Sequence, residues 1–181
     1  MNAHDTHVEQ VTLVNERDEV IGRMEKLEAH RVGALHRAFS IFIFNREGRL
    51  LLQQRADGKY HSPGLWTNSC CGHPRPGEPT MKAAQRRLHE ELGIRCELTE
   101  EFTFSYRAEF GNGLIEHELD HVFFGRHDGP FFPAKEEVKD LRWMRMNDLA
   151  DDLRTSPGMY TAWLAVCWPK VLDRFSLRLR A

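Results

Sequence analysis

The sequence predicts an α+β fold, an α-β-α sandwich built on one mixed sheet, and three features of the chain support this prediction. Apolar residues recur every three to four positions from Thr80 to Leu92, which is the period of a helix. The run from Ala38 to Phe44 is β-forming and apolar on both faces, as expected of a buried central strand. A further helix is expected to start at Ser156. Strands before and after a central helix, with another helix at the end, are typical of this class.

The other elements follow from β-forming runs and the turn residues between them. Along the chain, the expected strands are Val8–Val14, Val20–Gly22, Ala38–Phe44, Leu50–Gln54, Cys96–Tyr106, Leu114–Gly125 and Val138–Met144. Turns are expected at 15–19, 45–48 and 111–113. Residues 26–36 are expected to form a mixed polar connection and residues 127–137 a loop. A short helix is expected at Asn147–Leu153, capped near Asn147 or Asp148, and Pro169 is expected to kink or interrupt the last helix.

Length and composition are those of one globular domain spanning 1–181, with a core at about 35–170. The formal net charge of −2 provides no field that would attract nucleic acid. Apolar runs are far shorter than the roughly 20 residues that span a bilayer, and the polar N-terminus lacks a signal-peptide core. The four cysteines contain no C-x-x-C pair, so we expect a reduced, cytoplasmic protein. We also expect either a monomer or a weak dimer.

The central helix has an apolar face and a charged face. Thr80 is expected to be its N-cap, and Gly93 ends it. Arg86 and Glu90, like Arg87 and Glu91, are four residues apart, so each pair meets on the side opposite the apolar residues. An isolated pair of this kind is usually an ordinary solvated ion pair.

The wider spacing around this helix is more specific. The segment from Gly72 to Ile94 resembles the Nudix box, G-x5-E-x7-R-E-U-x-E-E-x-G-U, where U is a bulky aliphatic residue. Every fixed position matches except one, because Arg87 stands where the family has a glutamate. The resemblance implies carboxylates that hold a divalent cation on a diphosphate. Arg87 removes one such ligand and supplies a cation for phosphate oxygens, so hydrolysis is disfavoured while diphosphate binding is not.

A carboxylate pair and several histidines are candidate metal ligands. Glu116 and Glu118 project from one face of an expected strand. The alternative interpretation of this pair is the exposed face of an edge strand. Together with His30, His36 and His73 they would form a His3Glu2 set, which suits six-coordinate Mn²⁺ or Mg²⁺, and Zn²⁺ is also compatible. Each of these histidines alone is more simply a surface or hydrogen-bonded residue. The remaining candidates are expected to be solvated: His7, His61, His117 and His127.

Cysteine and basic residues add a second group of candidates. Cys71 follows Cys70 and precedes Gly72, so it is either buried filler or a reactive thiol beside a metal-binding helix. The basic residues that would form a diphosphate clamp, or simply lie on the surface, are Lys26, Arg55, Lys59 and Arg87.

Together these segments resemble type 1 isopentenyl-diphosphate Δ-isomerase, a Nudix-type sandwich, over most of the chain. The shared motifs are W-T-N-S-C-C-G-H-P from Trp66, R-R-x-x-x-E-L-G from Arg86, Y-R-A from Tyr106, E-H-E from Glu116 and H-R-A-F-S from His36. The resemblance implies that Cys71 and Glu118 face each other across the substrate double bond, with Tyr106 assisting. It also implies an aromatic lid at Trp163. The implied metal ligands are His30, His36, His73, Glu116 and Glu118, with Glu91 on a Mg²⁺ that arrives with the diphosphate, and the implied diphosphate contacts are Lys26, Arg55, Lys59 and Arg87.

The implied reaction converts isopentenyl diphosphate into dimethylallyl diphosphate through a tertiary carbocation, a step of isoprenoid biosynthesis. Protonation of an alkene and removal of a proton from the next carbon need two proton carriers on opposite sides of a flat group. The sequence does not decide which of Cys71 and Glu118 donates. Two other functions compete with this hypothesis: a Nudix diphosphohydrolase, and a catalytically silent metal-binding or nucleotide-binding module of the same fold.

Overall fold

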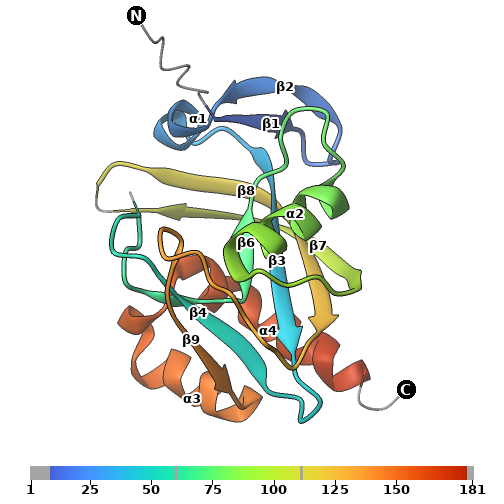
Figure 1. Cartoon of the computed structure of the whole chain (residues 1–181). Helices are drawn as coiled ribbons and strands as arrows, with labels where there is room; N and C mark the ends of the chain where they lie inside the picture. Colours follow the sequence, from blue (N-terminus) through green and yellow to red (C-terminus); the bar gives the residue numbers. More distant parts are fainter. Residues whose placement is uncertain (1–8, 60, 111, 179–181) are drawn as a thin grey trace, which may run out of the picture.

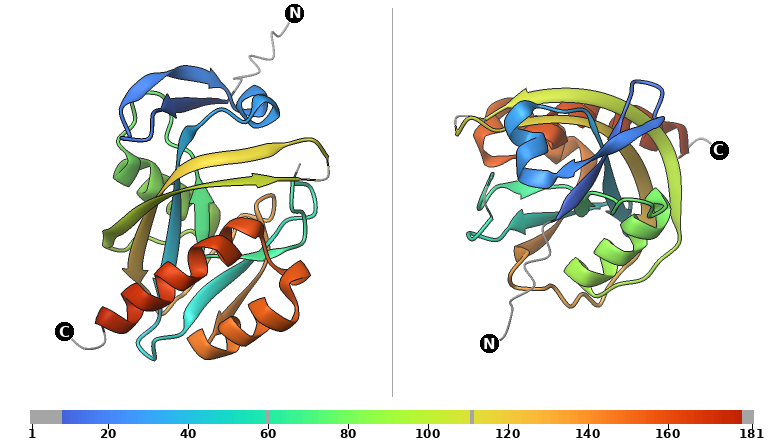
Figure 2. Two further views of the ribbon diagram at one scale, coloured as in Figure 1. Left: turned by 180° about the vertical axis from the view of Figure 1, so that it is seen from behind. Right: turned by 90° about the horizontal axis from the view of Figure 1, so that it is seen from above.

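The computed structural model describes residues 9–59, 61–110 and 112–178. One mixed sheet forms the middle of the molecule, with a helix against each face (Figure 1). The helix α2 (Thr80–Leu92) lies on one face and α4 (Ala162–Arg178) crosses the other, as the view from behind shows (Figure 2). The predicted α+β sandwich with a mixed sheet is therefore confirmed. None of the described helices is both long enough and apolar enough to cross a membrane.

The strands and helices of the described residues have the following bounds. The strands are β1 (Gln10–Val14), β2 (Val20–Glu25), β3 (His36–Phe44), β4 (Leu50–Arg55), β5 (Trp66–Thr67), β6 (Cys70–Gly72), β7 (Leu98–Glu109), β8 (Ile115–Arg126) and β9 (Val138–Met144). The other helices are α1 (Lys26–Val32), α3 (Met146–Thr155) and a 3₁₀ turn η1 (Pro157–Met159).

Strand β3 is the centre of the sheet. It pairs antiparallel with β1 and β6 and parallel with β8, and the parallel register places His36 opposite Glu118. It meets β4 only at Phe44 and Leu50, after which β4 pairs with β5 and β9. The antiparallel pair β7–β8 curves around the molecule when it is seen from above (Figure 2). The sheet therefore brings residues near 36 beside residues near 118.

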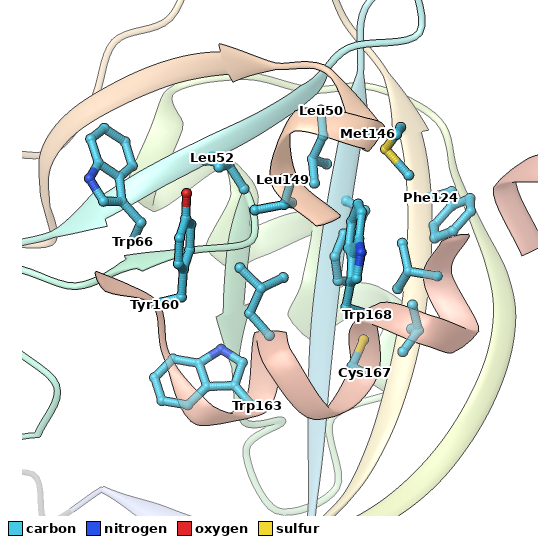
Figure 3. Packing of buried hydrophobic residues seen from close by; sticks show 14 of the residues in the cluster. Leu50, Leu52, Trp66, Phe124, Met146, Leu149, Tyr160, Trp163, Cys167 and Trp168 are labelled. Atoms are coloured by element: carbon cyan, nitrogen blue, oxygen red, sulfur yellow. The ribbon is translucent and has the colours of Figure 1, made fainter. Parts of the chain in front are cut away.

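Alternation along β3 creates two apolar cores. Phe42 and Phe44 belong to the core on the α4 side, and Ile41 and Ile43 belong to the core on the α2 side. All four side chains are buried, which fulfils the prediction of a central strand buried on both faces. In the α4 core, an aromatic group of Trp66, Tyr160 and Trp163 lies at one end, away from Trp168 and Phe124 (Figure 3).

The predicted polar connection at 26–36 is wrong, because it contains α1. The side chain of Glu25 accepts hydrogen bonds from the backbone N–H groups of Leu27 and Glu28, both at 2.8 Å, and so caps the helix. Gly33 ends it with φ 66°, a left-handed conformation that favours glycine. A seven-residue helix capped by glutamate leaves little periodic signal in the sequence.

Helix starts differ from the expectations by one or more residues. Pro79, not Thr80, is the N-cap of α2, and α3 begins at Met146 after Arg145. Neither start has a side-chain capping bond, so the polar residues there gave a misleading signal. After η1, the last helix begins at Ala162 and continues through Pro169 without interruption. Proline has no N–H to donate to the carbonyl four residues earlier in the helix. Because Pro169 is exposed, water can reach that carbonyl instead.

The strand bounds shift by a few residues. β3 begins two residues before the predicted Ala38, β2 continues to Glu25, and β7 spans Leu98–Glu109 instead of starting at Cys96. Val8 and Gly111, which belong to a predicted strand and a predicted turn, lie outside the described residues.

Candidate active site

A cavity of about 1030 Å³ opens between α2, β3, β8 and the start of α4. Most of the candidate site residues line it: Lys26, Arg55, Lys59, Cys71, His73, Arg87, Glu91, Tyr106, Glu116, Glu118 and Trp163. His30 and His36 do not line the cavity, and they lie behind its wall against Glu118. The sheet thus collects side chains from the whole length of the chain around one space of the size that small-molecule sites have.

Three histidines converge on one carboxylate oxygen. The Nε2 atoms of His73, His36 and His30 lie 2.9, 3.5 and 4.0 Å from Oε1 of Glu118. The candidate ligand atoms of these four residues all lie within 4.8 Å of one another. Glu116, which the sequence places in the same set, is not part of this group.

Backbone contacts fix the direction in which two of these rings face. Nδ1 of His30 lies 2.7 Å from the carbonyl oxygen of Lys26, and Nδ1 of His36 lies 2.8 Å from that of Ala34. A carbonyl only accepts, so each Nδ1 carries a proton, and each ring directs its Nε2 at Glu118. Burial lowers the pKa of His30, and it lowers the pKa of His73 to about 4, which favours neutral rings. Three imidazole nitrogens and a carboxylate oxygen gathered this closely fit a divalent metal ion.

Tyr106 connects the two glutamates of β8. Its hydroxyl lies 2.7 Å from Glu118 Oε2 and 3.0 Å from Glu116 Oε2. Burial and the two carboxylates raise the pKa of Tyr106 well above its usual range, so the phenol stays protonated. One phenol proton serves one carboxylate, so a proton on one of the two carboxyl groups would complete the second contact.

The two glutamates have opposite ionisation tendencies. Burial, and then the charge of Glu118, raises the pKa of Glu116 well above its ordinary value. Burial acts in the same direction on Glu118, but contacts with His36 and His73 outweigh it and hold the pKa of Glu118 well below the ordinary range. These opposite shifts favour one ionised and one protonated carboxyl group, with Tyr106 between them.

Cys71 lines the same cavity from β6. Its backbone pairs with Ser40 of β3, in the strand that also pairs with β8. Burial raises the pKa of the Cys71 thiol to about 12; Arg55 opposes this increase, whereas nearby carboxylates add to it. The sulfur is therefore a neutral thiol at neutral pH, and Glu118 is a carboxylate.

A network of basic and acidic groups occupies another part of the wall. Nη2 of Arg87 lies 2.6 Å from Glu91 Oε1 and 3.1 Å from Glu137 Oε1, and Lys59 forms an ion pair with Glu137. Burial alone would lower the pKa of Arg87, but Glu91 and Glu137 reverse this effect and raise it. Lys26 pairs with Glu9 at 3.0 Å at the same cavity. The expected i,i+4 ion pairs of α2 are present, but Glu91 is buried and does not lie on a solvated face.

Trp163 forms an aromatic wall of the cavity. Its ring lies 5.2 Å from the guanidinium carbon of Arg55, and its Nε1 donates to Asn68 Oδ1 at 3.2 Å. His61 packs edge-on against Trp163 at 5.7 Å and stacks on Phe110 at 5.6 Å.

The prediction that His61 is solvated is therefore wrong, because its side chain is only 10% exposed and lines the cavity. Of the other three histidines, His117 and His127 are half-buried, and each contacts a backbone carbonyl instead of lying free in solvent; His7 lies outside the described residues.

The sequence analysis also missed Glu137 and Gln53. Glu137 lies in the segment predicted as a loop, with no neighbouring motif to mark it. Gln53 lies on β4, and its side chain donates to Glu91 at 3.1 Å. Both positions depend on which strands become neighbours, and periodicity along the chain carries no such information.

Known proteins are similar to this chain in sequence and in fold. The NUDIX domain model matches residues 34–164. The isopentenyl-diphosphate Delta-isomerase 2 of Aromatoleum aromaticum is 53% identical over 169 residues, covering 93% of this chain and 89% of that protein. The isopentenyl-diphosphate Delta-isomerase of Pectobacterium atrosepticum is 48% identical over 164 residues, covering 91% and 92%.

The chain belongs to the isopentenyl-diphosphate Delta-isomerase family. Solved structures support the same fold at lower sequence similarity. A crystal structure of a Deinococcus radiodurans protein has a TM-score of 0.75 at 22% identity, covering 90% of this chain and 98% of that one. The MutT protein of Methanosarcina mazei has a TM-score of 0.62 at 17% identity, covering 81% and 96%.

The family's box spans the turn from β6 into α2. A Cβ atom at Gly72 would lie 3.1 Å from the Phe39 ring and 3.6 Å from Cγ of Arg87, so glycine permits this close approach. Arg86 binds Glu78 at 2.8 Å and holds the loop against the helix. Arg87, at the position where the box has a glutamate, lines the cavity beside Glu91.

Proposed function

We propose that this chain converts isopentenyl diphosphate into dimethylallyl diphosphate. The observation that carries the proposal is the joint position of Cys71, Glu118 and Tyr106 in a cavity that also presents basic side chains. Relatives with the isomerase name, about half identical over most of the chain, support the same activity. The basic side chains suit the diphosphate, and the remaining wall suits a five-carbon alkene.

The reaction needs one proton added and another removed. A proton binds the terminal alkene carbon, which leaves a tertiary carbocation, and a proton then leaves the neighbouring CH2 to form the new double bond. The protonation states of the free enzyme, a Cys71 thiol and a Glu118 carboxylate, give this pair one transferable proton. Glu118 with Tyr106 serves one face of the alkene and Cys71 the other.

Two features of the wall protect the cation. The ring of Trp163 is a neutral π-surface, which stabilises a positive charge without forming a bond to it. Trp163, Tyr106 and Glu118 are all buried, so little water has access to this part of the wall. Exclusion of water prevents capture of the cation as an alcohol.

Metal ions complete the proposed site. His30, His36, His73 and Glu118 would hold a divalent ion, Mn²⁺ or Mg²⁺ with Zn²⁺ as the alternative. Glu116, which shares the Tyr106 hydroxyl with Glu118, is the proposed fifth ligand. A bound ion would supply positive charge that keeps Glu118 ionised and in place. Glu91 would contact a Mg²⁺ that enters with the diphosphate. The diphosphate contacts are Lys26, Arg55, Lys59 and Arg87.

The proposed enzyme is cytoplasmic and consists of one domain. It acts on a small soluble substrate as a monomer or weak dimer. All four cysteines are free in the structure, which suits a reducing compartment. Sedimentation velocity at micromolar concentration would measure the mass, and a stable higher oligomer would contradict this part of the proposal.

The decisive experiment uses isopentenyl diphosphate in D₂O with Mg²⁺ and Mn²⁺, followed by NMR. Dimethylallyl diphosphate that carries deuterium, without released phosphate, is the expected product. Phosphate release would instead indicate a hydrolase. Tight diphosphate binding with no turnover by the metal-loaded protein would indicate a silent binding module.

Paired cysteine variants then test the two-sided proton transfer. Cys71→Ala is expected to lose almost all turnover, while Cys96→Ala, which changes a thiol outside the cavity lining, should keep it. Near-normal turnover in Cys71→Ala would refute the two-sided scheme.

A further inference from the structure

Glu137 lies beside Glu91 at the wall of the cavity. Both carboxylates contact the same nitrogen, Nη2 of Arg87, at 3.1 and 2.6 Å. The other oxygen of Glu137 binds Nζ of Lys59. Two carboxylates therefore converge on one cationic atom at the cavity wall.

The backbone holds Glu137 in this place. Its carbonyl accepts a hydrogen bond from the backbone N–H of Ala56 at 3.0 Å, and the next residue, Val138, pairs with Arg55. The side chain is 26% exposed and lines the cavity. The neighbouring Glu136 is exposed and does not line the cavity, so only one of these two adjacent glutamates faces it.

Before substrate enters, the two carboxylates are matched by two cations, and Arg87 also contacts Glu90 at 2.9 Å through its other terminal nitrogen. Glu91 and Glu137 contribute two negative charges, and Arg87 and Lys59 contribute two positive charges. An incoming diphosphate attracts both cations and brings Mg²⁺ with it. If the cations turn to phosphate oxygens, the two carboxylates lose their cationic partners while they lie close together, although Gln53 still donates to Glu91. The lowest-energy arrangement then places a new cation between the carboxylates.

We propose that Glu137 is the second protein carboxylate of the diphosphate-bound Mg²⁺ site, beside Glu91. This inference rests on the proposed function, because it takes the substrate to be a diphosphate. Mg²⁺ is typically held by one or two carboxylates together with substrate phosphate oxygens, and this pair supplies that set. In the free enzyme, Arg87 and Lys59 keep the two carboxylates in position, and they exchange partners when the Mg²⁺–diphosphate complex enters.

The test measures binding of inorganic pyrophosphate by calorimetry at a series of Mg²⁺ concentrations. Glu137→Gln should need roughly tenfold more Mg²⁺, or more, for half-maximal pyrophosphate binding. In EDTA the same variant should bind pyrophosphate as well as the wild type or better, since Lys59 and Arg87 lose a competing carboxylate. The matched control Glu136→Gln should behave as the wild type in both conditions.

Two results would overturn the inference. One is an unchanged Mg²⁺ requirement in Glu137→Gln. The other is an equal loss of affinity with Mg²⁺ and in EDTA, which would make Glu137 only a support for the two basic side chains. Glu137→Asp provides a second variant if the amide fails to fold, and it should recover part of the Mg²⁺ dependence.

Pyrophosphate has no double bond, so this test is independent of isomerisation. A wild type that leaves isopentenyl diphosphate unchanged but shows the Glu137-dependent Mg²⁺ requirement would refute the proposed function and leave the inference standing. A wild type that isomerises, with Glu137→Gln unaltered in its Mg²⁺ requirement, would do the reverse.

Discussion

Tyr106→Phe separates the role of one hydroxyl from that of the ring that carries it. The Tyr106 ring is buried and stacks on Phe104 at 5.6 Å, and phenylalanine preserves that packing. The substitution removes the donor that lies 2.7 Å from Glu118 and 3.0 Å from Glu116. The variant should therefore fold normally and lose a specific hydrogen bond in the site.

The size of the effect follows from the kind of hydrogen bond. A hydrogen bond to an ionised group contributes about 1.5–3 kcal/mol. If the bond to Glu118 acts mainly in the transition state, kcat should fall about 10- to 150-fold, because roughly 1.4 kcal/mol corresponds to a factor of ten. KM should change little, since the basic residues proposed to contact the diphosphate are untouched.

Steady-state NMR assays with isopentenyl diphosphate would measure kcat and KM for both proteins. Tyr160→Phe is the matched control. The Tyr160 hydroxyl bonds to Asp152 at 2.8 Å and accepts from Arg142 at 2.7 Å, outside the cavity lining. A kcat of Tyr106→Phe within twofold of the wild type would refute the assignment of Tyr106 as partner of Glu118.

Three further predictions concern stability. In EDTA, His73 should lower the free energy of unfolding by up to roughly 1.4 kcal/mol per pH unit as the pH drops from 6.5 towards 4. The reason is that burial lowers the pKa of His73 to about 4, so the unfolded chain binds the proton first. Urea titrations would measure this slope, and an equal slope in His73→Asn would contradict the prediction. Mn²⁺ at about 100 times its Kd should add about 2.7 kcal/mol to the free energy of unfolding and raise the Tm by roughly 5–10 °C, measured by calorimetry. An equal rise in His36→Ala would exclude the proposed ligand set. Gly125→Ala should lower the free energy of unfolding by about 1–3 kcal/mol, measured in urea, because its Cβ would lie 2.8 to 3.0 Å from three side-chain atoms. Gly58→Ala, whose Cβ would have nothing within 4 Å, should be near neutral. Equal losses in the two variants would refute the packing argument.

Local patterns predicted the elements whose signal lies within one stretch of sequence. The helix α2 has a three- to four-residue period and a glycine stop, and β3 has an unbroken apolar run, so both were predicted nearly to the residue. Two-residue spacing placed Glu116 and Glu118 on one face of β8, and the structure brings both to Tyr106. These cases need no knowledge of the tertiary fold.

The missed features depend on contacts between distant segments. His61 follows a polar turn and has no periodic neighbours, yet Trp163 and Phe110 enclose it. Glu137 lies near the site only because β9 pairs with β4. The helix α1 was missed for a different reason: it is two turns long, and glutamate, an uncommon capping residue, begins it. Tertiary neighbours and rare caps leave no repeating pattern in a single sequence.

The parallel pairing of β3 with β8 also sets the order in which the metal cluster can form during folding. His30, His36 and His73 leave the ribosome well before Glu118, and the four candidate ligands meet only when His36 comes opposite Glu118 in the sheet. Closure of such a long loop is a late and slow event in folding. A metal ion therefore has little to bind in the early collapsed chain, and it binds when the topology is complete. Its main kinetic effect should be to slow unfolding, so that the lifetime of the folded enzyme depends on metal supply while its folding rate does not.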